Sequence, residues 1–147
     1  MESVYKRVLK FQNKYPNTVG WRMKEHCSVV QKHLNPGENI IYAFIAQKND
    51  NPLNIIETAV IALTDHRILI GRKRLLYGYF LTSITPDMFN DLDIAAGLIW
   101  GKVHIDTIKE LVTLSNIDKR ALTEIETEIS SFMMEAKKLY KERKKEE

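Results

Sequence analysis

The chain has 147 residues, of which 44% are hydrophobic and 28% are charged, and its net charge is +3. This length fits one domain, and the apolar fraction can build a core, which excludes wholesale disorder. The single cysteine excludes an intramolecular disulfide framework and every CxxC metal site.

Residues 1–35 are predicted to form a helical N-terminal extension, which carries the positive excess of the chain. Apolar residues recur at spacings of four, three and four over Val4–Tyr15, which places them on one helix face. Pro16 ends this helix, because proline disfavours helix at the residue before it. Residues 19–34 form a second amphipathic run, although the alternation at its start also suits a short strand. Pro36 and the residues beside it mark a turn.

Residues 39–114 carry short β-rich apolar stretches separated by turn residues, a pattern typical of an antiparallel sheet or barrel. Tight turns are expected at 64–66, 96–97 and 106–107. Pro86 marks a corner, because proline cannot donate to a strand ladder. We predict seven strands, near residues 39–47, 58–64, 66–72, 75–82, 90–96, 98–105 and 107–114.

From Leu122 to Tyr140, apolar residues step by three or four over more than four turns, which predicts an amphipathic helix. Ser115 or Asp118 can cap its start by accepting a backbone N–H. Residues 141–147 are all charged and are expected to form a solvated helix end. The face expected to plug one end of the sheet consists of Leu122, Ile125, Ile129 and Phe132.

Three segments resemble bacterial pleckstrin-homology-like (PH-like) domains of the YokE type. Residues 36–43 (PGENIIYA) resemble the opening strand, residues 63–70 (LTDHRILI) the hairpin motif, and residues 99–105 (IWGKVHI) the penultimate strand. The resemblance covers residues 36–140 and leaves the extension, 1–35, outside it. It implies an α+β, mainly β, fold: a seven-stranded antiparallel barrel or sandwich capped by a C-terminal amphipathic helix.

The resemblance also directs attention to the loops at one end of the barrel. The resemblance implies a comparison with eukaryotic PH domains, many of which bind phosphoinositides through basic residues in the loop after the first strand. In this chain the corresponding loop, residues 48–57, holds one basic and two acidic residues, which departs from that pattern. The next loop at that end has three adjacent cations, at 72–74, which either bind an anionic headgroup or form a solvated hairpin tip. Asp106, in the turn that completes this end in the family, would repel an anion. The predicted binding residues are Arg72, Lys73, Arg74, Lys48 and Arg67.

Enzymatic chemistry has little support in the sequence. No GxSxG, Walker A, GxGxxG or HExxH motif occurs, and the four histidines and Cys27 lack metal-ligand spacing. We therefore expect no catalytic residue, cofactor or metal, and a reduced thiol at Cys27. The net charge of −1 over residues 39–114 argues against a nucleic-acid footprint.

Two functions stay open. The first is a non-catalytic PH-like module that binds a protein partner or a second copy of itself, with Trp21 and Trp100 considered as interface anchors, although we expect Trp100 in the core. The alternative is peripheral attachment to an anionic membrane surface through residues 72–74, joined by the basic helix at Val4–Tyr15 unless that helix packs on the barrel. With no span of ~18 apolar residues, either function predicts a cytoplasmic protein, in the second case peripheral to the membrane.

Overall fold

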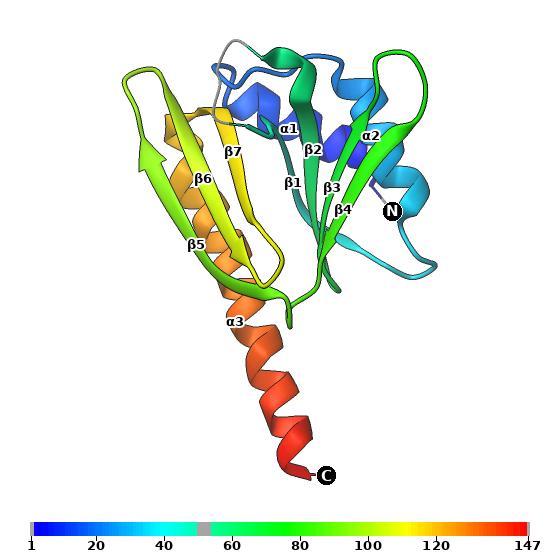
Figure 1. Ribbon diagram of the computed structural model, residues 1–147, viewed down its shortest axis with the longest axis vertical. Coiled ribbons are helices and arrows are strands. Elements are labelled where there is room, and N and C mark those ends of the chain that lie inside the picture. Colours follow the sequence, from blue (N-terminus) through cyan, green and yellow to red (C-terminus); the bar gives the residue numbers. More distant parts are fainter. Residues whose placement is uncertain (1, 50–53, 147) are drawn as a thin grey trace.

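The computed structural model describes residues 2–49 and 54–146, in which two helices, seven strands and one long helix follow one another (Figure 1). The helices are α1 (Val4–Lys14), α2 (Met23–His33) and α3 (Leu122–Glu146), and short 3-10 helices span Ile55–Glu57 and Lys119–Ala121. The strands are β1 (Ile40–Gln47), β2 (Thr58–Thr64), β3 (Ile68–Lys73), β4 (Tyr79–Ile84), β5 (Phe89–Ala96), β6 (Trp100–Thr107) and β7 (Leu111–Asp118).

The strands form one antiparallel sheet in the order β4-β3-β2-β1-β7-β6-β5, curled into a half-barrel. The two halves join where β1 meets β7, at the pair Gln47 and Ser115. The edge strands β4 and β5 belong to opposite halves, so the barrel is open between them (Figure 1). The predicted seven-stranded antiparallel sheet with a C-terminal helix is confirmed.

Strands β1 to β3 are buried on both faces, because α1 and α2 cover their outer side. All seven residues of β2 are buried, which explains why the sequence of this strand is almost continuously apolar and does not alternate between apolar and polar residues. The apolar face of α1 packs on this sheet, which places the basic amphipathic helix on the barrel. The outer core contains Val4, Val8, Cys27, Val30, Ile40, Ala43, Ile45, Val60, Ala62 and Leu69.

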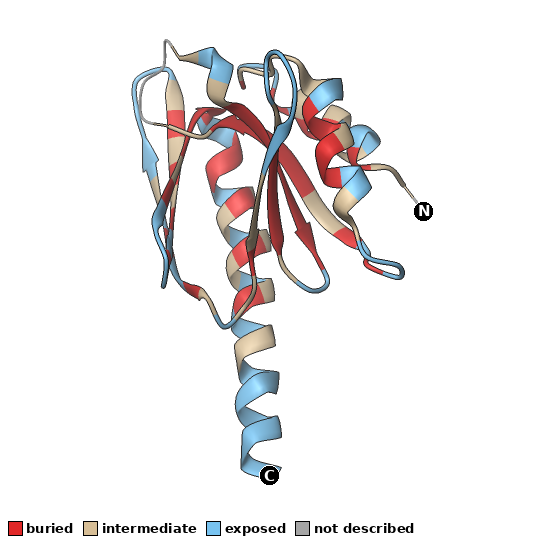
Figure 2. Ribbon diagram, turned by 45° about the vertical axis from the view of Figure 1, so that its right-hand side comes forward, coloured by how far each residue is buried: buried red, intermediate tan, exposed pale blue. Residues whose placement is uncertain are grey.

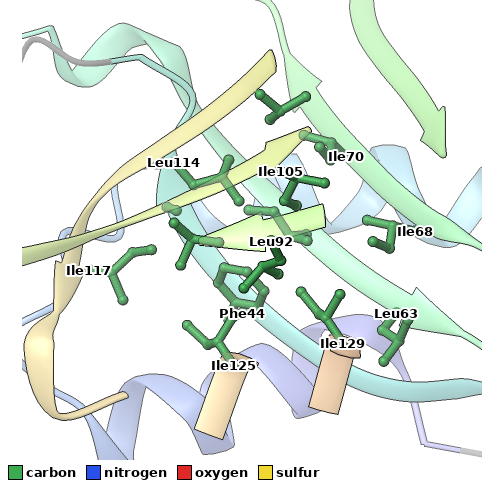
Figure 3. Close-up of a cluster of buried hydrophobic side chains, with 14 of the residues drawn as sticks. Phe44, Leu63, Ile68, Ile70, Leu92, Ile105, Leu114, Ile117, Ile125 and Ile129 are labelled. Carbon is green, nitrogen blue, oxygen red and sulfur yellow. The ribbon is translucent and has the colours of Figure 1, made fainter. Parts of the chain in front are cut away.

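The inner core lies between the two halves of the sheet and α3. Ile125 and Ile129 point from α3 toward Phe44 of β1 and Leu92 of β5 (Figure 3). Leu122, Ile125 and Ile129 are buried as predicted, but the fourth predicted residue, Phe132, is only half-buried. Met133 takes its place, since a step of four from Ile129 stays on the buried face. No described helix is both long enough and apolar enough to cross a bilayer.

Two predicted strands are misplaced. The fourth was predicted from residue 75, but β4 begins at Tyr79, because the preceding apolar residues form a turn. The seventh was predicted at 107–114, whereas β7 spans Leu111–Asp118. The turn before it is built by Thr107, whose Oγ1 accepts hydrogen bonds from the N–H groups of Lys109 and Glu110. The other five strands agree to within two residues at each end.

Candidate functional site

The hairpin that joins β3 to β4 carries an apolar tip at one end of the molecule (top of Figure 2). Its turn is closed by the N–H of Arg74, which donates to the carbonyl of Gly78 over 3.0 Å. Gly78 has a φ of +86°, a left-handed conformation that favours glycine. Inside this turn, Leu75, Leu76 and Tyr77 stand in solvent with 57%, 86% and 78% of their surface exposed. We call these three residues the apolar apex.

Three cations, Arg72, Lys73 and Arg74, form a basic collar at the base of the apex. The guanidinium groups of Arg72 and Arg74 lie over the ring of Phe80, with Cζ 4.5 Å and 5.3 Å from its centre. Arg72 also donates from Nη1 to the carbonyl of Ile56 over 3.3 Å. Contacts of this cation–π kind hold the guanidinium groups in place without neutralising their charge.

Helix α2 holds the base of the hairpin. Nδ1 of His26 accepts a hydrogen bond from the backbone N–H of Lys73 over 2.9 Å. Only a ring nitrogen without a proton can accept this bond, and burial, together with the nearby charge of Arg22, lowers the pKa of His26 to about 4. At the other end of α2, the ring of His33 lies 4.8 Å from the ring of Tyr79. The N-terminal extension thus helps to fix the direction in which the hairpin points.

A cleft of about 300 Å³ opens beside the basic collar. Nζ of Lys48 lies 3.3 Å from Oγ1 of Thr82 and 3.9 Å from Oε1 of Glu110. Glu57, on the cleft wall, accepts a hydrogen bond from the side-chain amide of Asn49. Because carboxylates face the cations, the cleft does not favour a multiply charged anion. Its lining consists of Lys48, Glu57, Ala59, Ile70, Arg72, Phe80, Leu81 and Thr82.

Arg67 lies at the opposite end of β3 from the collar, in a largely buried ion pair. Its Nε and Nη2 each donate to a carboxylate oxygen of Glu38 over 3.0 Å, and the Glu38 side chain is 1% exposed. The hydroxyl of Thr64 donates to the same carboxylate over 2.6 Å. Burial alone would raise the pKa of Glu38, but hydrogen bonds from Arg67 and Thr64 outweigh it and lower the pKa from 4.5 to about 2. Arg67 also donates to the carbonyl of His33, so it ties α2 to the sheet.

The structure therefore brings together some of the predicted binding residues and separates others. The collar residues share the hairpin, and Lys48 lines the same cleft as Arg72, as the strand alternation indicated. Arg67 lies apart from both. Residues 50–53 of the Lys48 loop, which include one of its two acidic residues, lie outside the described residues. The carboxylate that faces Lys48 belongs to Glu110 rather than to Asp106.

Sequence reasoning missed the apolar apex, because Leu75, Leu76 and Tyr77 were assigned to a strand. A usable signal was present: the residues follow three cations directly and precede a glycine, which is typical of a turn. Trp100, expected in the core, is half-buried instead, and its indole N–H donates to the carbonyl of Asn17 over 2.9 Å.

The thiol of Cys27 is unsuited to nucleophilic chemistry. Cys27 is buried in α2, and burial raises the pKa of its thiol to about 12, so it does not form the reactive thiolate at neutral pH. Over the described ranges, 2–49 and 54–146, no three side chains of His, Cys, Asp or Glu gather as a metal site.

Comparison with known proteins adds one finding. The family model described as "Bacterial PH domain" matches residues 34–131. The matched segment starts after α2 and includes all seven strands and the first turns of α3. The match is to the family as a whole, and assignment to its YokE-type group stays a prediction. No curated protein matches the chain.

Proposed function

The chain belongs to the bacterial PH domain family, whose members serve as modules for binding or scaffolding, and from this premise we propose that it attaches, without catalysis, to an anionic membrane surface. The observation that carries the proposal is the apolar apex set in its basic collar. Attachment would insert the apex between the lipid headgroups and leave the collar at headgroup level.

The apex has the composition and shape of an inserting element. Leu76, at its summit, is 86% exposed, and Leu75 and Tyr77 flank it. Large apolar residues gathered on a surface mark interaction sites, because each leaves water favourably when it is covered. A narrow, protruding turn offers little area to a flat protein surface, whereas lipid headgroups can part around it.

The residues around the apex suit the interface between headgroups and water. Arg72 and Arg74 are held over the ring of Phe80, and Lys73 lies between them in sequence. Basic residues at an anionic leaflet contribute about 1 kcal/mol each. Tyr77 and Tyr79, both more than half exposed, are aromatic residues of the type enriched at this depth.

A second apolar turn lies at the same end of the molecule. The turn between β5 and β6 stands at the top in both views of the ribbon, as the hairpin does (Figures 1 and 2). Its residues Leu98 and Ile99 are 92% and 60% exposed. A surface that contacts a bilayer needs its apolar residues at one end of the molecule, and these two turns meet that requirement.

Co-sedimentation with vesicles tests the proposal. Wild-type protein is expected to bind phosphatidylglycerol-rich vesicles in a salt-sensitive way and to bind phosphatidylcholine vesicles far less. Leu76→Ser should weaken binding by roughly 10- to 100-fold, because covering one leucine contributes about 1.5–3 kcal/mol. Met134→Ser is the matched control, since Met134 is 72% exposed on α3, which leaves the molecule at the opposite end.

Replacement of two collar charges tests the electrostatic part separately. Lys73→Glu/Arg74→Glu should abolish the preference for anionic vesicles. Lys138→Glu/Lys145→Glu, the same change of charge on α3, should leave most of it. Wild-type protein that binds no vesicle, or Leu76 and Met134 variants that bind equally, would refute the proposal.

A further inference from the structure

The C-terminal half of α3 extends beyond the sheet. Met133 is the last buried residue of the helix, which continues to Glu146. Figure 1 shows this part projecting from the end of the molecule opposite the β3–β4 hairpin. Residues 134–146 therefore form a helical arm that is available to a second interaction, distinct from the proposed membrane face.

The arm keeps an apolar stripe on the side that faces the β4–β5 corner. Ala136, Leu139 and Tyr140 continue the buried face of α3, with Leu139 and Tyr140 49% and 53% exposed. The stripe and the corner bound a groove of about 690 Å³. Its lining consists of Pro86, Asp87, Ala136, Lys137, Leu139, Tyr140, Lys141 and Arg143.

The charged residues around the groove are predominantly basic. Lys137, Lys141 and Arg143 line it, against the single carboxylate of Asp87. The whole arm, 134–146, holds six basic and three acidic residues, a net charge of +3. Within the part of the chain that the structure describes, none of these three cations forms an ion pair. An occupant must therefore offer carboxylates as well as apolar side chains.

We infer that this groove docks an acidic amphipathic helix of a protein partner. An exposed apolar stripe along a helix is complementary to the stripe of another helix, whose ridges pack into its grooves. Glutamates beside the partner's stripe would pair with Lys141 and Arg143. A second copy of the arm fits poorly, because two arms of net charge +3 repel each other. The protein would then hold a membrane at one end and an acidic partner at the other.

Binding of designed peptides tests this inference. The probe is a fluorescein-labelled 16-residue helical peptide with leucines at every third or fourth position, glutamates beside the leucine stripe and alanines elsewhere. The control is the same peptide with lysines in place of the glutamates. We expect the acidic peptide to bind at least 10-fold more tightly than the basic one in fluorescence anisotropy. Lys141→Glu/Arg143→Glu should weaken it by at least 10-fold.

The control variant Lys138→Glu/Lys145→Glu changes the net charge by the same amount at two residues of the arm that do not line the groove. It should weaken binding less than 3-fold. If the two double variants weaken binding equally, the interaction depends only on the net charge of the arm, and the inference is wrong. Equal binding of the two peptides, or binding of neither, would also overturn it. A wild-type dimer in sedimentation equilibrium that Tyr140→Ala dissociates would assign the groove to a second copy instead. None of these outcomes depends on vesicle binding, so the two proposals fail separately.

Discussion

Replacing Arg67 tests the ion pair that ties α2 and the segment before β1 to the sheet. Arg67→Met keeps an unbranched apolar stem but removes the guanidinium group and with it both hydrogen bonds to Glu38. The carboxylate of Glu38, 1% exposed, then keeps only the hydroxyl of Thr64 and the N–H of Asn35. Removing one partner of a buried ion pair costs about 3–5 kcal/mol.

The pKa of Glu38 shows that the ionised carboxylate is stabilised in the fold. Hydrogen bonds from Arg67, Thr64 and the N–H of Asn35 together outweigh the cost of burial and lower the pKa from 4.5 to about 2. Because Arg67 supplies the only countercharge among these groups, Arg67→Met should lower the free energy of unfolding by about 3 kcal/mol at pH 7. Urea unfolding followed by circular dichroism measures this loss.

A double-mutant cycle with Glu38→Gln shows whether the loss belongs to the pair. The double variant Glu38→Gln/Arg67→Met should lose less stability than the two single variants lose in sum, because it leaves no uncompensated charge buried. A loss below 1 kcal/mol for Arg67→Met, or additive losses, would refute this reasoning. Folded Arg67→Met protein should still bind vesicles, since Arg67 lies far from the collar.

Three further predictions concern the fold. Because the folded pKa of Glu38 is depressed, its contribution to stability is present above about pH 4.5 and is lost as the pH falls toward 2. Between these pH values the wild type should lose about 3 kcal/mol more stability than Glu38→Gln, measured by urea unfolding followed by circular dichroism, because the buried carboxylate of Asp118, whose pKa is also about 2, remains in both. Gly71→Ala should lower stability by about 1–3 kcal/mol in urea, because its Cβ would lie 2.6 Å from Cγ2 of Val30; unchanged stability would contradict this packing. Removing residues 1–33 should cause aggregation in light scattering, because it uncovers the outer face of β1–β3, and a stable monomer would contradict that role for α1 and α2.

The sequence predicts the architecture well where periodicity reflects burial. The helical extension, the order of the strands and the long final helix follow from apolar spacing alone. Spacing fails where apolar residues are not buried: Leu75 to Tyr77 read as a strand but form the exposed apex. It also fails at the last turn, where the hydroxyl of Thr107 organises backbone bonds that no hydrophobic pattern reveals.

Only part of the candidate site could be predicted from the sequence. The three adjacent cations predicted a site at this hairpin, but the residues that position them cannot be identified from the neighbouring sequence. The ring of Phe80 lies under two guanidinium groups, and His26 accepts a hydrogen bond from the backbone N–H of Lys73. These two residues belong to different elements, β4 and α2. Arg67 was grouped with the cations because its partner, Glu38, lies 29 residues away.

Insertion of the apolar apex into lipid is the central claim, and a fluorophore at its summit tests it most directly. Leu76→Cys can be labelled selectively, because Cys27 is buried and the pKa of its thiol is about 12. With phosphatidylglycerol-rich vesicles, an environment-sensitive label at position 76 should shift its emission to the blue and be quenched by lipid-attached quenchers, whereas the same label at Met134→Cys should not respond. A label at position 76 that stays in water while the protein co-sediments with vesicles would contradict the account.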